Sequence, residues 1–101
     1  MADRLYLQNL LEEILGSSNV YFQPPASIKM KYPAIVYFRS DIRNTFADNN
    51  VYKQDNAYDV TTIDADPDSE IPMKISRLPK CRFNRFYTAD NLNHNNFTIY
   101  I

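Results

Sequence analysis

The stretch that decides the fold is PAIVYFRSDIRNTFADNNVYKQDNAYDVTTI, residues 33–63. It predicts two strands, Ala34–Phe46 and Val51–Ile63, separated by a turn at Asp48-Asn49-Asn50, because Asn and Asp tolerate left-handed backbone. The polar residues Gln54-Asp55-Asn56 interrupt the second strand. The pattern therefore predicts a long β-hairpin with a polar tip.

The side chains of the first strand divide between two faces of the expected sheet. One face carries Ile35, Tyr37, Arg39, Asp41 and Arg43, and the other carries Val36, Phe38, Ser40, Ile42 and Asn44. The first half of the strand is apolar on both faces, which is typical of a buried strand, whereas the second half is mostly polar. We therefore expect the hairpin to leave the core and project outward.

The flanking sequence predicts two helices and three further strands. The first helix is amphipathic and spans Asp3–Leu15, with Asp3 as its cap and Gly16 at its end, and the second spans Glu70–Leu78, with Ser69 as its cap. A short strand is expected over Val20–Gln23. The strands Arg82–Tyr87 and Phe97–Ile101 are expected to form a hairpin around the connection Asp90–Asn96. The order α-β-β-β-α-β-β indicates one α+β domain over residues 1–101. We expect a mostly antiparallel sheet with a long projecting hairpin and two helices packed on one face.

The composition restricts the classes of function open to the chain. The 101 residues include 1 Gly, 1 Cys and 1 His, and the formal net charge is -1. A phosphate-binding loop needs several glycines, so this composition excludes a nucleotide site of that kind, and a single Cys cannot form an internal disulfide. A nearly neutral chain has no general attraction for nucleic acid or an anionic membrane. Because the chain has no apolar run near ~18 residues and no signal-peptide pattern, we expect intracellular synthesis.

Neither the single His nor the single Cys stands in a catalytic pattern. His94 is expected in an Asn-rich turn without a neighbouring nucleophile, so a polar turn residue is favoured over a general base. Cys81 lies between two bases, a setting that lowers a thiol pKa, but it begins an alternating strand and is favoured as a small core residue. One Cys and one His cannot complete a zinc site within one chain. We therefore expect no enzymatic activity, no catalytic residue and no cofactor.

The acids Asp64, Asp66, Asp68 and Glu70 have the spacing that begins an EF-hand calcium loop. Pro67 interrupts this run, and the Gly and the final Glu that such a loop requires are missing. A solvated loop that leads into a helix N-terminus is the favoured interpretation, without a metal site. A metal-dependent nuclease or hydrolase that uses this loop is the alternative from the enzyme class.

Charge is segregated along the second half of the chain. Residues 55–70 contain six acids and no base, and residues 74–85 contain five bases and no acid. These stretches either pair within one subunit or face solvent, or they lie on opposite flanks, so that the acidic edge of one copy meets the basic edge of the next. In the second arrangement the contacts close a ring, and the interface residues are Asp64, Asp66, Asp68 and Glu70 opposite Lys80, Arg82 and Arg85.

Four segments of the chain are similar to small neck and tail-completion proteins of tailed bacteriophages. They read YPAIVY at 32–37, YDVT at 58–61, IDADPDS at 63–69 and RFYTADNLNH at 85–94. The chain resembles the tail terminator group in particular. The resemblance follows the order of elements over nearly the whole chain and rests in detail on the last two segments.

The resemblance implies a structural virion protein that is made in the host bacterial cytoplasm. Such a protein forms a hexameric ring that caps the tail tube, ends its polymerisation and joins the tail to the head connector. The implied partners are further copies of the chain, the tail tube protein and the head-completion or connector protein, with no membrane and no specific nucleic-acid binding, although DNA passes through the ring. The expected tube or neck contacts lie on the long hairpin, at Arg39, Asp41, Arg43, Asn49 and Asn50. The alternatives are a head-closure or adaptor protein of the same neck and a small non-enzymatic protein-binding module.

Overall fold

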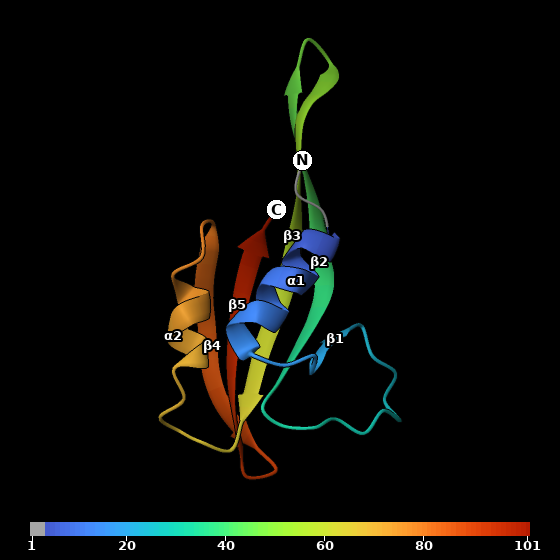
Figure 1. The fold of residues 1–101 in the computed structure, drawn as a ribbon. Helices are drawn as coiled ribbons and strands as arrows, with labels where there is room; N and C mark the ends of the chain where they lie inside the picture. Colours follow the sequence, from blue (N-terminus) through green and yellow to red (C-terminus); the bar gives the residue numbers. More distant parts are fainter. Residues whose placement is uncertain (1–3) are drawn as a thin grey trace.

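The structure, a computed structural model, describes residues 4–101, except the side chains of residues 43, 45 and 51–54. The elements follow one another as α1 (Arg4–Leu15), β1 (Val20–Phe22), β2 (Ala34–Ala47), β3 (Asn50–Asp64), α2 (Ile71–Ser76), β4 (Cys81–Ala89) and β5 (Leu92–Tyr100) (Figure 1). This order is the predicted one, and the α+β class is confirmed.

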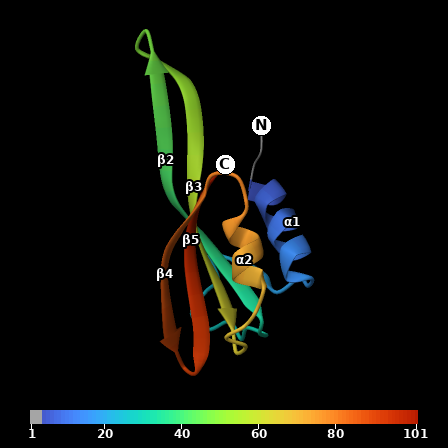
Figure 2. The same ribbon diagram turned by 90° about the vertical axis from the view of Figure 1, so that its left-hand side faces the viewer.

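The strands form one sheet in the order β1-β2-β3-β5-β4. β1 runs parallel to β2, and the other neighbouring strands are antiparallel. Both helices lie on one face of this sheet, which we call the helix side (Figure 2). The opposite face, the open side, carries no helix in the part of the chain that the structure describes. The predicted packing of two helices on one face is therefore confirmed.

The core lies between the helices and the sheet. Leu7 and Leu11 of α1 and Ile75 of α2 are fully buried, because the i, i+4 spacing in α1 directs both leucines toward the strands. The three inner strands β2, β3 and β5 and the edge strand β1 each contribute at least one side chain to the core. These residues are Val20, Ile35, Tyr37, Tyr58, Val60, Phe97 and Ile99, and Cys81 of the other edge strand, β4, packs against them. Burial of an aliphatic or aromatic side chain of this size stabilises the fold by about 1.5–3 kcal/mol.

The ends of the helices differ in part from the prediction. Gly16 ends α1 with φ +80, and its N–H donates to the carbonyl of Glu12 over 2.8 Å, so this prediction is confirmed. The expected cap Asp3 lies outside the described residues. The second helix is shorter than predicted, because it spans only Ile71–Ser76 and its N-cap position is Glu70, which makes no side-chain cap. Ser69 Oγ nevertheless accepts the N–H of Ile71 over 3.3 Å.

Two-residue turns join the strands of both hairpins. Their residues have positive φ, at 52 and 64 for Asp48-Asn49 and at 52 and 61 for Asp90-Asn91, which is the backbone that a tight hairpin turn needs. The tighter turns lengthen the strands beyond the prediction. Residues 93–96 lie in β5 rather than in a turn, and β3 runs without interruption through residues 54–56, so both of those predictions are wrong.

The β2–β3 hairpin projects far beyond the other elements, as predicted (Figure 1). Arg39 pairs with Tyr58 and Asp41 with Ala57, so Ser40 is an extra residue that forms a β-bulge. The bulge reverses the alternation, and Asp41 therefore lies on the open side instead of the side of Tyr37. The predicted faces are wrong for Asp41, Ile42 and Asn44, and the side chain of Arg43 lies outside the described ones. We call residues 41–56 the arm, and it accounts for a molecule with extents of 51 × 27 × 23 Å.

Candidate interaction surfaces

The arm carries exposed apolar side chains and is only two strands wide. Ile42 is 47% exposed and Phe46 is 64% exposed. Ile42 pairs with Asn56, which precedes Tyr58 by two residues, so Ile42 and Phe46 lie on the helix side of the arm. The last support from β5 is the pair of backbone bonds between Asn56 and Ile101, each 2.8 Å. A hairpin of two strands is marginally stable in water on its own. Its exposed apolar side chains make the arm a candidate surface for contact with a partner.

The base of the arm is fixed by hydrogen bonds across the bulge. Ser40 Oγ donates to the carbonyl of Ala57 over 3.2 Å. Arg39 Nη2 donates to the hydroxyl of Tyr58 over 3.4 Å, and its guanidinium lies 5.9 Å from the centre of the same ring. The backbone N–H of Arg39 donates to Oε1 of Gln23 over 3.3 Å. These bonds set the direction in which the arm leaves the sheet.

The predicted contact residues of the hairpin are spread along the arm and do not form one cluster. Arg39 lies at the base, where Tyr58 engages it. Asp41 follows on the open side, and its Oδ1 accepts the N–H of Ile42 over 2.8 Å. The side chain of Arg43 lies outside the described residues. Asn49 forms the turn at the tip, and Asn50 Nδ2 donates to the carbonyl of Asp48 over 3.3 Å.

The acidic loop between β3 and α2 is organised by its own backbone. Asp64 Oδ1 accepts the N–H of Asp66, and Asp66 Oδ1 accepts the N–H of Asp68, each over 2.9 Å. Two successive turns of this kind account for the alternating spacing of the acids without a bound cation. Among the residues that the structure describes, no group of three or more His, Cys, Asp or Glu side chains could hold a metal ion.

The basic residues of the predicted interface lie on or beside β4. Lys80 Nζ lies 3.9 Å from Asp55 Oδ1, which is an ion pair within one subunit. Arg82 and Arg85 are exposed, and the Arg85 guanidinium lies 4.8 Å from the centre of the Tyr87 ring.

The acidic loop leads into α2, which packs against β4, so the two charged segments share the β4 side of the molecule (Figure 1). Their predicted placement on opposite flanks is therefore wrong. It failed because α2, which directly follows the acidic loop, packs against β4, and the sequence does not reveal this contact. A role of these residues in contacts between subunits stays a prediction.

The free edge of β4 carries an apolar strip that the sequence did not reveal. Phe83 is 51% exposed and Phe86 is 55% exposed, and Met73 of α2 is 60% exposed. A bulge at Asn84 places Phe83 and Phe86 on the same face, the helix side, although an odd spacing normally separates two residues of a strand. A pocket beside the strip is lined by Pro72, Met73, Ser76, Phe83, Asn95 and Phe97. We call Met73, Phe83 and Phe86 the apolar strip.

The open side of the sheet carries a row of bonded polar side chains. Asn96 Nδ2 donates to Asp59 Oδ1 and, over 2.9 Å, to Thr61 Oγ1. Asn84 Nδ2 donates to Asn96 Oδ1 over 3.0 Å and to Thr98 Oγ1 over 2.8 Å. These side chains satisfy one another's hydrogen-bonding groups across three neighbouring strands.

The single His and the single Cys both occupy strands. His94 stacks on the Tyr87 ring with 4.7 Å between centroids, in β5 rather than in the predicted turn. Cys81 is half-buried against the core, as predicted, and burial raises the pKa of its thiol. A raised pKa keeps the thiol protonated and unreactive near neutral pH.

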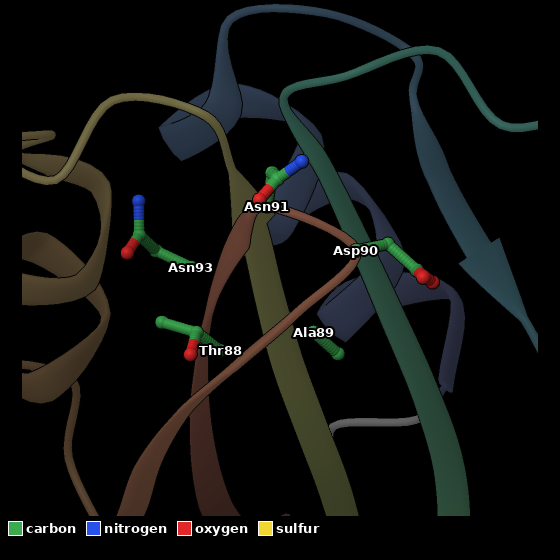
Figure 3. Close-up of a pocket in the computed structure, with 5 residues that line it drawn as sticks. All are labelled: Thr88, Ala89, Asp90, Asn91 and Asn93. Carbon is green, nitrogen blue, oxygen red and sulfur yellow. The ribbon is translucent and has the colours of Figure 1, made fainter.

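A hollow at the end of the β4–β5 hairpin is lined by Thr88, Ala89, Asp90, Asn91 and Asn93 (Figure 3). The labelled side chains do not converge on a common point. Asn93 Nδ2 donates to the carbonyl of Asp64 over 3.2 Å and so joins this hairpin to the start of the acidic loop. The lining of the hollow consists of small or polar side chains and includes one carboxylate, that of Asp90.

No family model, no curated protein and no solved structure matches this chain. Within residues 4–101, no helix has the length and apolar character required to cross a membrane.

Proposed function

We propose that this chain is a structural assembly protein that forms a ring from copies of itself. The ring, a hexamer of the tail terminator kind, caps the tail tube of a tailed phage, ends its polymerisation and joins the tail to the head connector. The protein acts through its surfaces and has no catalytic role.

The observation that carries this proposal is the exposed arm. A chain of 101 residues extends a two-stranded hairpin beyond its core and places Ile42 and Phe46 on it in contact with water. Exposed aromatic side chains at the centre of an interface commonly supply a large share of binding energy. An exposed arm of this kind can bind neighbouring subunits in an assembly.

The phage assignment rests on the sequence resemblance of Ile63–Ser69 and Arg85–His94. Both segments approach the end of the sheet that lies opposite the arm (Figure 1). The molecule thus has two distinct ends, the arm and this hairpin end. A ring that joins tube to connector needs two different faces, and these ends supply them.

Microscopy of the purified protein with and without tail tubes tests the proposal. We expect rings that cap the tube ends and tubes that stop growing when the protein is added. Reversal of charge at Arg82 and Arg85, both exposed on β4, should weaken assembly, because these side chains are proposed to contact the next subunit. Reversal at Lys29 and Lys31, exposed on the β1–β2 connection, is the matched control.

Two results would contradict the proposal at different levels. A protein that stays monomeric at every concentration and salt, and forms no ring with tail tubes present, would exclude the ring. An oligomer that is unaffected by the changes at Arg82 and Arg85 would exclude the charged contact but not the ring.

A further inference from the structure

We infer that the arm of one copy docks along the free edge of β4 in a second copy, where Ile42 and Phe46 cover the apolar strip. This inference rests on the proposed self-assembly and identifies the two surfaces that meet. It differs from the charge-based contact because it adds backbone pairing and apolar burial.

The first argument is that both surfaces have unpaired strand edges. β4 is the last strand of the sheet, so within residues 4–101 one side of its backbone has no strand beside it. β1 pairs with β2 only as far as Tyr37, and the part of β2 in the arm therefore has a free edge on that side. Free strand edges are templates for pairing with another chain.

The second argument is the direction of the strands. β2, β3, β5 and β4 are antiparallel in succession, so β2 and β4 run in opposite directions within one subunit. When a second copy keeps the same orientation and is shifted along the strand direction, the arm part of β2 in one copy and β4 of the other are antiparallel without inversion of either. The contact is head-to-tail, so it can repeat from copy to copy, and it closes a ring when the rotation between copies permits.

The third argument is the match in length. The part of β2 in the arm, Asp41–Ala47, spans about 23 Å at the usual rise of a strand. The strand β4, with 9 residues, spans about 30 Å on the same basis. The arm therefore covers most of the free edge.

The fourth argument is the chemistry of the two faces. Ile42 and Phe46 lie on the helix side of the arm, and Phe83 and Phe86 lie on the helix side of β4. Pairing of the edges places these apolar side chains together beside Met73, because neighbouring strands share their faces. The contact buries large side chains that are otherwise about half exposed or more, with exposed fractions from 47% for Ile42 to 64% for Phe46.

Charge favours a second copy of this chain as the occupant. Residues 41–56 contain three acids and two bases, whereas residues 74–85 contain five bases and no acid. A nucleic acid bound to these bases would leave the apolar strip in water, which disfavours it as the occupant.

Cross-linking between two populations of the full chain tests the contact and its direction. Both populations carry Cys81→Ala; one adds Ala47→Cys in the arm, and the other adds Arg82→Cys near the start of β4. A flexible bismaleimide should join the two chains into a covalent pair. The matched control replaces Arg82→Cys with Ala89→Cys at the far end of the same strand, which antiparallel docking keeps away from Ala47. Equal or stronger cross-linking to position 89, or none at either position, would overturn the inference.

Substitution of the apolar contacts gives an independent measurement. Phe46→Ser and Phe83→Ser should each raise the dissociation constant of the assembly by on the order of tenfold or more, as sedimentation over a concentration series would show. Leu5→Ser is the control, because Leu5 is 59% exposed on α1 and lies outside both surfaces. Unchanged association of both Phe variants would overturn the inference.

The outcomes separate this inference from the proposed function. One outcome is a protein that is monomeric alone and forms rings on tail tubes, with the same rings formed by the Phe46→Ser variant. That outcome would support the proposed function and overturn the arm contact. An assembly with the expected cross-link that does not bind tail tubes would keep the arm contact and contradict the function. A reciprocal dimer with the same cross-link would likewise keep the contact and contradict the ring.

Discussion

The hydroxyl of Tyr37 donates a hydrogen bond to Oε1 of Gln8 and so joins β2 to α1 inside the protein. Gln8 Nε2 donates in turn to the carbonyl of Val20 over 3.2 Å, which adds β1 to the link. Arg4 Nη1 donates to the same hydroxyl over 3.3 Å, and its guanidinium lies 4.6 Å from the centre of the Phe22 ring. One tyrosine therefore holds α1 against the parallel edge of the sheet.

Loss of this hydroxyl should destabilise the protein. Tyr37→Phe keeps the buried ring but leaves Gln8 without its donor, so we expect the free energy of unfolding to fall by about 1–2 kcal/mol. Denaturation by urea measures this change. Tyr32→Phe is the control, because Tyr32 is 47% exposed and its variant should unfold as the unmodified protein does. Equal stability of all three proteins would show that the bond to Gln8 contributes nothing.

Stability should also fall at alkaline pH. Burial raises the pKa of the Tyr37 hydroxyl above 10.0, against the opposing effect of Arg4, and burial raises the pKa of the Cys81 thiol above 9.0. The folded state therefore binds these protons more tightly than the unfolded state. The resulting stability is present below pH about 9 and is lost as pH rises through the folded-state pKa values. Urea denaturation from pH 7 upward should show this loss, with a smaller loss for Tyr37→Phe; an identical pH profile for that variant would contradict the assignment to Tyr37.

Much of the fold could be predicted because local signals agreed with the final packing. The leucines at positions 7 and 11 and the glycine at 16 specified α1, and the change from apolar to polar residues along β2 specified the arm. These signals depend only on residues that are close in sequence, so the predictions made from them do not require knowledge of the strand order in the sheet.

The errors came from features that depend on distant partners. The bulges at Ser40 and Asn84 reverse the faces of the residues that follow, and a strand pattern alone does not reveal an extra residue. The apolar strip was missed for this reason, since regular alternation along β4 places Phe83 and Phe86 on opposite faces. The run Asn93–Asn96 was expected to be a turn because Asn favours turns, but Asn96 finds Asp59 and Thr61 across the sheet.

Positive φ at Asn91 makes the β4–β5 turn sensitive to substitution. Asn91→Val should lower the free energy of unfolding by about 1–2 kcal/mol, because a β-branched side chain is strained at φ 61. Asn91→Gly should match the unmodified protein or exceed it slightly, since Gly is favoured in this turn. Thermal unfolding measures both variants, with Thr88→Val as a control on the exposed surface of β4. Equal melting temperatures for the Val and Gly variants would contradict the turn geometry.

Removal of the arm should leave the rest of the protein folded. Residues 43–55 can be replaced by Asn-Gly, because Ile42 and Asn56 are already paired across the hairpin and a two-residue turn closes such a pair. None of the described arm side chains belongs to the core, and the ion pair between Lys80 and Asp55, which the deletion removes, lies at the surface. We expect the free energy of unfolding of the monomer to change by less than about 1 kcal/mol.

The same deletion should abolish association, because it removes Phe46 and most of the free edge of β2. Sedimentation over a concentration series and thermal unfolding at low concentration measure the two effects separately. A folded variant that assembles as the full chain does would show that the arm is dispensable for assembly. A variant that does not fold would show that the arm stabilises the sheet, which the exposure of the arm and its projection beyond both helices argue against.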